Sequence, residues 1–264
     1  MKFLYKHGNH LVEPSLWPII TSFSIFGLLF NLALSSHGYI GNPIHVILSV
    51  ITLFLSVVLW TRDVVIEGTY LGQHTLKVRK GLILGYILFL ISEVMFFVGI
   101  FWAYIHSSMG PTVEIGSMWP PIDIASIGPL ELPLFNTIIL LSSGATITYS
   151  HHSLLANNYS GAVNGLLITV LLAVLFLICQ FIEYKYATFT ISDGVYGSCF
   201  FLGTGWHGMH VIIGTLFLTA CLLRMVNYHF TSTHHVGYEC TIFLWHVVDV
   251  VWLVLYVLFY FWGS

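Results

Sequence analysis

Long apolar runs, each bounded by polar residues or by Gly and Pro, follow one another along this chain of 264 residues. A transmembrane helix needs about 20 mostly apolar residues, because the hydrocarbon core of a bilayer is about 30 Å thick. Runs of roughly that size predict transmembrane helices at residues 16–34, 44–60, 82–105, 134–156, 161–183, 196–224 and 240–262. The pattern therefore predicts an all-α, polytopic membrane protein. We find no internal repeat and no long linker, so we expect a single membrane domain over residues 1–264 with an N-terminal tail over residues 1–15.

The fourth run differs from the others because its segment "LSSGATITYSHHS" is rich in hydroxyl groups. Ser and Thr can return hydrogen bonds to their own helix or reach a neighbouring helix. The segment is therefore expected to span the membrane with its polar side facing protein.

The amino-acid composition supports the assignment to a membrane and argues against some classes of partner and site. Only 7% of residues are charged, 57% are hydrophobic, and the mean hydropathy is +0.89, whereas soluble domains carry about 25% charged residues. A net charge of −3 argues against nucleic acid as a partner. The cysteines show no CxxC spacing, so neither a zinc ribbon nor a redox pair is indicated; they are Cys179, Cys199, Cys221 and Cys240.

The distribution of Lys and Arg predicts the orientation, because basic residues accumulate on the inner side of a membrane. All but one of the basic residues fall on the side of the N-terminus: Lys2, Lys6, Arg62, Lys77, Arg79, Lys80 and Arg224. Only Lys185 falls on the other side. We expect the N-terminus inside and the C-terminus outside. A cleaved signal ending at "LALSS" is a competing interpretation, but the first run exceeds the roughly 7–15 residues of a signal core.

Two other classes of helical membrane protein find little support in the sequence. A retinal protein needs a lysine within a span, and the seventh run contains none. A bis-histidine haem site needs facing histidines; His207 and His210 share one helix face, but no second pair matches them. Buried, hydrogen-bonded histidines are the alternative interpretation. His246 and Asp249 are three residues apart, so they could satisfy each other or form a carboxylate–histidine relay.

Glu93 lies within the third run, which otherwise contains no charged side chain between residues 82 and 105. On a helix, small residues form one narrow stripe that predicts close approach of a neighbouring helix: Gly81, Gly85, Ser92, Gly99 and Ala103. Glu93 lies about 100° away from that stripe. It shares its face with bulky residues, namely Tyr86, Phe89, Phe96, Phe97, Ile100 and Tyr104.

Three explanations for Glu93 follow. The carboxyl group could be protonated and hydrogen-bonded to a neighbouring helix, since a neutral acid costs much less in hydrocarbon than a carboxylate. It could carry protons, as ionisable groups inside membranes often do. It could also anchor polar groups in a wet or lipid-filled cleft. A proton wire would need further titratable groups, and this run offers only tyrosines.

Several long segments resemble one known family. They are "LWTRDVVIEGTYLGQHTLKVRKGL", "ISEVMFFVGIFWAYIHSS", "ELPLFNTIILLSSGATITYSHHSL", "FTISDGVYGS", "GWHGMHVIIGT" and "HHVGYECTIFLWHVVDVVWLVLYVLFYFWGS". These segments resemble subunit III of mitochondrial cytochrome c oxidase, from "PSLWPII" to the final "FYFWGS".

The resemblance implies a core, non-redox subunit of complex IV, multi-pass in the mitochondrial inner membrane. The N-terminus would lie in the matrix and the C-terminus in the intermembrane space. The implied fold is seven helices in two groups, helices 1–2 and 3–7, separated by a V-shaped cleft filled with phospholipid. Haem a, haem a3 and the copper centres would reside in other subunits, and this chain would bind no cofactor besides phospholipids. The implied partners are subunit I, other core and accessory oxidase subunits, and the cytochrome bc1 complex in a supercomplex.

The resemblance also implies functional residues. Glu93 matches the family's intramembrane glutamate at the cleft. The residues that match lipid head-group contacts are Arg62, Glu67, His74, His210 and Arg224. Arg and protonated His donate charge-assisted hydrogen bonds to phosphate, although ordinary interfacial snorkelling would also explain His74 and His210.

We therefore expect the chain to stabilise subunit I, hold structural lipids and support proton uptake, with no catalytic, redox or metal centre of its own. We further expect His7 and His10 to collect protons near the matrix surface. An independent proton-conducting or transport protein centred on Glu93 is the main alternative. A seven-helix receptor is a third class, which the short inner loops disfavour.

Overall fold

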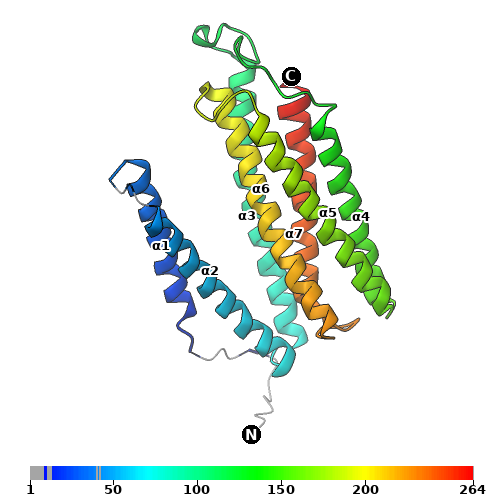
Figure 1. The fold of residues 1–264 in the computed structure, drawn as a ribbon. Helices are drawn as coiled ribbons and strands as arrows, with labels where there is room; N and C mark the ends of the chain where they lie inside the picture. The colour runs from blue at the N-terminus through cyan, green and yellow to red at the C-terminus, as the bar shows by residue number, and fades with distance from the viewer. Residues whose placement is uncertain (1–8, 11–13, 40, 42, 264) are drawn as a thin grey trace. The chain divides into compact units, whose positions relative to one another are not determined.

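The computed structural model describes residues 9–10, 14–39, 41 and 43–263, which form two compact units, Met1–Leu82 and Ile83–Ser264. In the first unit, α1 (Trp17–Ser36) packs against α2 (Ile44–Val65) (Figure 1). α2 continues as a short π-helix, η1 (Ile66–Tyr70). The two compact units do not test whether the chain forms one membrane domain, so the single domain stays a prediction.

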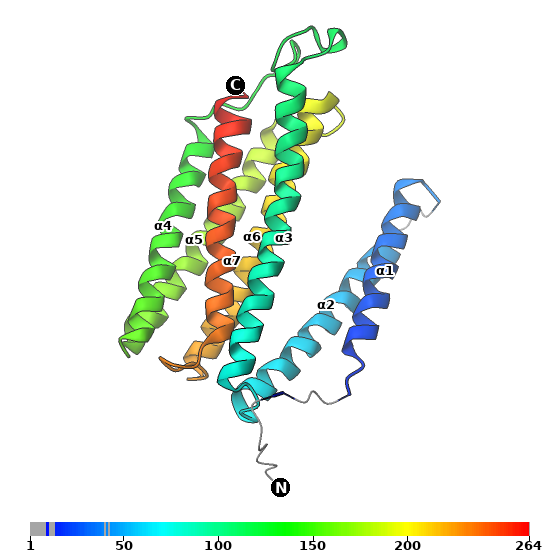
Figure 2. The same cartoon turned by 180° about the vertical axis from the view of Figure 1, so that it is seen from behind.

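The second unit contains most of α3 and all the later helices. Their bounds are α3 (Leu76–Met109), the 3₁₀ turn η2 (Val113–Ile115), α4 (Leu132–Leu155), α5 (Tyr159–Tyr186), α6 (Gly194–Val226), α7 (Val236–Leu255) and the π-helix η3 (Tyr256–Phe261). Figures 1 and 2 show α4, α5, α6 and α7 lying side by side. Within the described residues, 7 helices are long and apolar enough to cross a membrane, and no strand is formed. The all-α, seven-helix prediction is confirmed.

Several helices extend beyond the predicted apolar runs. Their additional turns carry polar side chains that can reach water. α2 runs past residue 60 through Arg62 and Asp63, whose side chains pair with each other at 2.8 Å. α3 begins at Leu76, so that Lys77 and Arg79 lie in its first turns. Long basic side chains reach water along a helix end, which lets the backbone remain helical beyond the hydrocarbon region.

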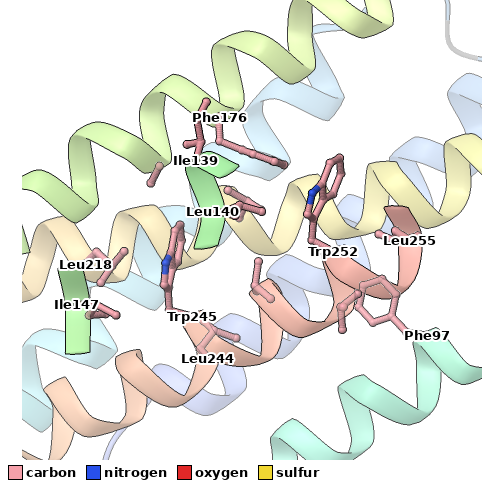
Figure 3. Packing of buried hydrophobic residues seen from close by; sticks show 14 of the residues in the cluster. Phe97, Ile139, Leu140, Ile147, Phe176, Leu218, Leu244, Trp245, Trp252 and Leu255 are labelled. Carbon is pink, nitrogen blue, oxygen red and sulfur yellow. The ribbon is translucent and has the colours of Figure 1, made fainter. Parts of the chain in front are cut away.

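The hydroxyl-rich helix α4 turns its polar side towards α7. The indole N–H of Trp245 donates to Ser143 Oγ at 2.9 Å, and that of Trp252 donates to Thr137 Oγ1 at 3.0 Å. Both indoles are buried, and Figure 3 shows them within the hydrophobic core. A buried indole N–H needs an acceptor, and the fourth span supplies one for each.

A third contact completes the series, because the hydroxyl of Tyr238 donates to Ser150 Oγ at 2.7 Å. Ser150 in turn donates to the carbonyl oxygen of Ala162 on α5 at 2.6 Å. We call the contacts Tyr238–Ser150, Trp245–Ser143 and Trp252–Thr137 the α4–α7 ladder. The α4 hydroxyls each accept one hydrogen bond from α7 and donate one to a backbone carbonyl, so their polar groups are satisfied inside the bundle.

Apolar side chains fill the space around the ladder. Phe176 from α5 packs edge-on against Trp252, with ring centroids 5.0 Å apart. Leu140 and Ile147 of α4 are almost completely buried, as is Leu218 of α6 (Figure 3). α3 contributes to the same core through its aromatic face, including Phe97.

The small-residue stripe of α3 is not covered by the helices of its own unit. Among the described residues of the second unit, nothing lies within 4 Å of a Cβ built on Gly85 or on Gly99. The core instead receives the bulky face of the same helix, where Phe97, Ile100 and Tyr104 are buried. The second unit itself therefore supplies no close helix at the stripe, and the expected close approach of a neighbouring helix stays a prediction.

Gly203 on α6 is a position where the fold requires the absence of a side chain. A Cβ built there would lie 2.5 Å from the ring of Phe259, which is buried. We expect Gly203→Ala to destabilise the bundle by about 1–3 kcal/mol through overpacking, measured as less assembled protein and a lower thermal midpoint. Gly208→Ala on the same helix is the control, because open space surrounds Gly208. Equal behaviour of the two variants would contradict the packing argument.

Candidate functional site

Glu93 on α3 faces α6, where its carboxyl oxygen Oε2 lies 3.0 Å from His210 Nε2. The two side chains are 24% and 11% exposed, so both are largely withdrawn from the surface. The geometry therefore favours the first explanation for Glu93, a hydrogen bond to a neighbouring helix.

The contact of the other ring nitrogen of His210, Nδ1, limits the hydrogen bond that Nε2 can make with Glu93. His210 Nδ1 lies 2.9 Å from the carbonyl oxygen of Trp206, and a carbonyl only accepts, so Nδ1 carries a hydrogen. Nε2 then either accepts the proton of a neutral Glu93 or donates to its carboxylate. Either arrangement gives Glu93 a hydrogen-bond partner on α6. A hydrogen bond lowers the cost of placing an acid in hydrocarbon.

Aromatic rings enclose the pair. The His210 ring lies 5.5 Å from the Phe97 ring and 5.9 Å from the Trp206 ring, and Phe96 packs on Trp206 at 4.8 Å. These rings give His210 largely apolar surroundings, in which a hydrogen bond is stronger than in water.

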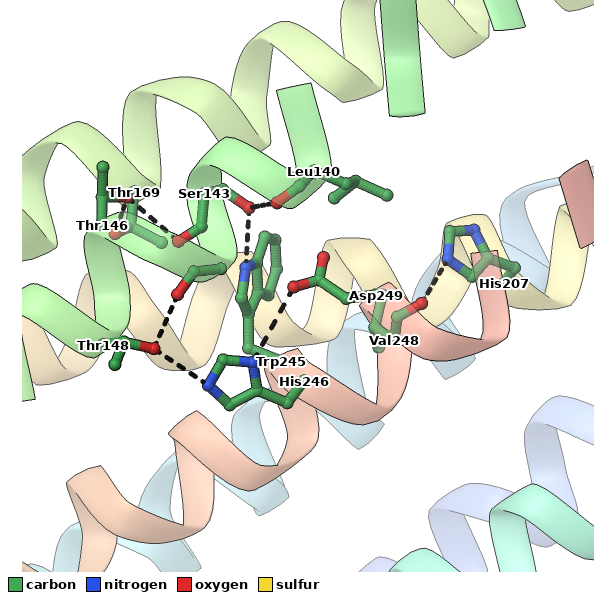
Figure 4. Close-up of polar contacts among 11 residues, drawn as sticks. Leu140, Ser143, Thr146, Thr148, Thr169, His207, Trp245, His246, Val248 and Asp249 are labelled. Atoms are coloured by element: carbon green, nitrogen blue, oxygen red, sulfur yellow. Dashed lines mark hydrogen bonds and ion pairs between the residues drawn. The ribbon is translucent and has the colours of Figure 1, made fainter. Parts of the chain in front are cut away.

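The other histidines within spans have structural partners. His207 is buried, and its Nε2 donates to the carbonyl oxygen of Val248 at 3.2 Å (Figure 4). His246 Nδ1 lies 3.9 Å from Asp249 Oδ2, which is too long for a hydrogen bond. His246 also approaches Thr148 Oγ1 at 3.4 Å. The geometry gives a carboxylate–histidine relay at His246 and Asp249 little support.

In the N-terminal unit, Arg62 belongs to a short polar chain. Arg62 donates to Asp63 Oδ1 through Nε at 3.0 Å and through Nη2 at 2.8 Å. The other oxygen of Asp63 accepts from the Trp17 indole at 2.5 Å. This chain ties α1 to α2. Sequence reasoning missed Asp63 and Trp17, although an acid directly after Arg62 was a usable signal.

Glu67 and His74 meet His10 in the same unit. Glu67 Oε2 lies 3.3 Å from His10 Nε2, and the His10 and His74 rings pack edge-on at 5.6 Å. One ligand atom from each of these residues lies within 4.8 Å of the others. The His10 side chain is only 10% exposed, so it lies inside this cluster and not on an open surface. His7 lies outside the described residues.

A pocket of about 630 Å³ adjoins this cluster. Polar groups occupy part of its lining, namely His10, Asp63, Glu67 and His74. Aromatic and aliphatic side chains form the remainder, including Trp17, Trp60, Leu71, Val78 and Leu82. The pocket is therefore amphipathic, with charged groups beside an apolar wall.

Arg224 lies in the last turn of α6, where its guanidinium group stacks over the Phe230 ring at 4.4 Å from the centroid. It thus belongs to the second unit, together with Glu93 and His210, whereas Arg62, Glu67 and His74 belong to the first.

These features define a polytopic helical membrane protein whose intramembrane acid is paired with a histidine. A family model described as cytochrome c oxidase subunit III matches residues 7–264. Cytochrome c oxidase subunit 3 of Yarrowia lipolytica is 53% identical over 264 residues, covering 100% of this chain and 98% of that protein. The same subunit of Saccharomyces cerevisiae is 56% identical over 258 residues, with coverages of 98% and 96%. That of Lachancea kluyveri is 56% identical over 254 residues, with coverages of 96% and 94%.

The chain belongs to the cytochrome c oxidase subunit III family. It is a subunit of complex IV, an oxidoreductase, and a multi-pass protein of the mitochondrial inner membrane. Other oxidase subunits are its partners, and membership is consistent with haem and copper residing in those subunits. The resemblance inferred from the sequence is confirmed.

The Glu93–His210 contact predicts different outcomes for two substitutions. In Glu93→Gln, the amide N–H can donate to His210 Nε2, so we expect nearly normal stability. In Glu93→Leu, Nε2 loses its partner in a poorly hydrated site, and we expect a loss of about 1–3 kcal/mol. The thermal midpoint of the purified oxidase and its content of this chain measure both effects. If Gln were as harmful as Leu, the contact would have a role beyond the hydrogen bond.

Proposed function

We propose that this chain supports the catalytic core of the oxidase by holding structural phospholipid and by packing on subunit I. The observation that carries the proposal is the amphipathic pocket of about 630 Å³ beside His10, Glu67 and His74. A phospholipid needs charged contacts for its head group and apolar contacts for its acyl chains, and this pocket offers both.

The mixture of charges in and beside the pocket favours a zwitterionic head group. Arg62 and the histidines suit the phosphate, because cationic N–H groups make charge-assisted hydrogen bonds with it. Asp63 and Glu67 would repel an anionic lipid but would attract the ammonium group of an aminophospholipid. A lipid with both charges satisfies both sets of side chains.

Glu93, His210 and Arg224 form the other half of the proposed lipid-binding set. Arg224 is a cation at the end of α6, and His210, the partner of Glu93, lies on the same helix. In the proposal, these residues border a V-shaped cleft between helices 1–2 and 3–7. The cleft and its lipids remain part of the proposal.

Orientation and partners complete the proposal. The bias of Lys and Arg supports an N-terminus in the matrix and a C-terminus in the intermembrane space. The stripe on α3 that contains Gly85 and Gly99 is not covered by the other helices of the second unit, which supports close packing of a helix from another subunit, for which subunit I is our candidate. A supercomplex with the cytochrome bc1 complex also belongs to the proposal, on the strength of family resemblance alone.

The main alternative, an independent proton-conducting protein centred on Glu93, receives less support from the geometry. Glu93 is engaged in a hydrogen bond with His210, and its own helix offers no further ionisable group at a neighbouring depth. Family membership also places the chain inside a larger complex. We therefore retain the supporting role.

The lipid proposal is tested by replacing polar groups of the pocket in the intact oxidase. We expect the double variant Glu67→Leu, His74→Leu to retain less phospholipid, measured by mass spectrometry of the purified complex. Its initial rate of cytochrome c oxidation should be unchanged, while activity should decay several-fold faster during sustained turnover. His37→Leu is the control, because His37 is exposed at the end of α1 and lies outside the pocket.

Oxidase depleted of the whole chain should behave in the same way, with normal early electron transfer and faster inactivation. Immediate and complete loss of electron transfer on depletion would contradict a supporting role. Unchanged lipid content in the double variant would contradict the pocket as the lipid site.

A second prediction concerns proton uptake. We propose that His7 and His10 help to gather protons, with His10 acting through its contact with Glu67. Replacing both histidines by Gln should slow proton uptake near neutral pH, where an imidazole exchanges protons readily, as measured with a pH indicator during single-turnover oxidation. An uptake rate equal to that of the unmodified oxidase would exclude this role.

A further inference from the structure

Two histidines and a glutamate from distant parts of the sequence meet at one end of the second unit. His151 lies near the end of α4, His235 directly precedes α7, and Glu239 lies in the first turn of α7. The end of α4 and the start of α7 lie at the same end of the helical bundle (Figures 1 and 2). None of the three residues belongs to the proposed lipid-binding set.

The three side chains present nitrogen and oxygen atoms to one point. His235 Nε2 lies 3.3 Å from His151 Nε2 and 3.3 Å from Glu239 Oε1. All three atoms lie within 4.8 Å of one another. Separations of this size match a small cation bound by all three groups.

The surroundings fix the orientation of the central ligand. His235 is buried, and its Nδ1 lies 2.8 Å from the carbonyl oxygen of Thr231, which only accepts. Nδ1 therefore carries the hydrogen, and in a neutral ring the lone pair of Nε2 points to the other two groups. Metal-binding histidines are commonly held in this way, with the second nitrogen donating to a carbonyl oxygen.

We propose that His151, His235 and Glu239 form a binding site for a zinc ion. Zinc bonds of about 2.0–2.1 Å in a tetrahedral arrangement place neighbouring ligand atoms about 3.3–3.4 Å apart. The two separations at His235 Nε2 have this value, and the third, between His151 and Glu239, is at most 4.8 Å. Three protein ligands leave the fourth position for water or for another ligand.

The two imidazoles and one carboxylate of the proposed site favour zinc over Mg²⁺ and Ca²⁺. Imidazole nitrogens suit zinc and its late transition-metal neighbours, whereas Mg²⁺ and Ca²⁺ prefer oxygen ligands. One carboxylate together with two imidazoles gives a site with net charge +1 when zinc is bound, less than that of the free ion. We therefore expect zinc to bind in the presence of a large excess of Mg²⁺.

The test uses the intact oxidase, stripped of loosely bound metal by dialysis and then equilibrated with ZnCl₂ in excess MgCl₂. Bound zinc is counted by elemental analysis in the unmodified complex and in His235→Gln, Glu239→Gln and His152→Gln. We expect the first two variants to lose about one zinc per complex, because each removes one of three ligands. His152→Gln should keep it, since His152 is an exposed neighbour outside the cluster.

Glu239→Gln preserves the size of the side chain, and the haem spectrum of each preparation shows whether the complex has assembled. Zinc absorption spectroscopy of the unmodified complex should show imidazole nitrogens that decrease in His235→Gln. Equal zinc content in all four assembled complexes would overturn the proposal and leave the cluster as a hydrogen-bonded group of side chains.

Discussion

The packing of the second unit depends on the α4–α7 ladder. Apolar surface gives little reason for helices to associate within a bilayer, because lipid chains are as apolar as the side chains. Packing and hydrogen bonds must then specify which faces meet. The ladder supplies both, since Trp245 and Trp252 fill the core while their indole groups bond to hydroxyls on α4. Ser150 extends the connection to α5 through the carbonyl oxygen of Ala162.

Polar partners also satisfy two of the histidines inside the spans. His210 is hydrogen-bonded to Glu93, and His207 donates to a backbone carbonyl. Ionisable residues within a membrane need not be centres of transport, because a matched partner is enough to retain them. Within the proposed lipid-binding set, Arg62 and Arg224 lie near helix ends, whereas Glu93 and His210 lie within their helices.

The sequence predicted the helices well but not the faces through which they meet. Seven apolar runs predict seven spans because a backbone in lipid must bond to itself. The hydroxyl-rich fourth run is an exception, because its polar side was expected to face protein and does face α7. In most other runs, core-facing and lipid-facing residues are similarly apolar, so the pattern does not reveal which side is buried. The stripe containing Gly85 and Gly99 predicted a close neighbour, but the helices of the second unit pack on the bulky face of α3. His151 and His235 are 84 residues apart, and only folding brings them together. The regular spacing of Tyr238, Trp245 and Trp252 was a signal for the ladder that sequence reasoning missed.

The seven-residue spacing of these donors limits which insertions and deletions α7 can tolerate. The three donors on α7 recur every seventh residue, which is close to two helical turns. Inserting or deleting a single residue between Tyr238 and Trp252 would rotate the donors beyond it by about 100°, away from their hydroxyl acceptors. A substitution on α7 removes one ladder contact at a time. An insertion or deletion rotates every donor beyond it, so it can break several ladder contacts at once. The length of this segment should therefore be under stronger selection than the identity of most of its residues.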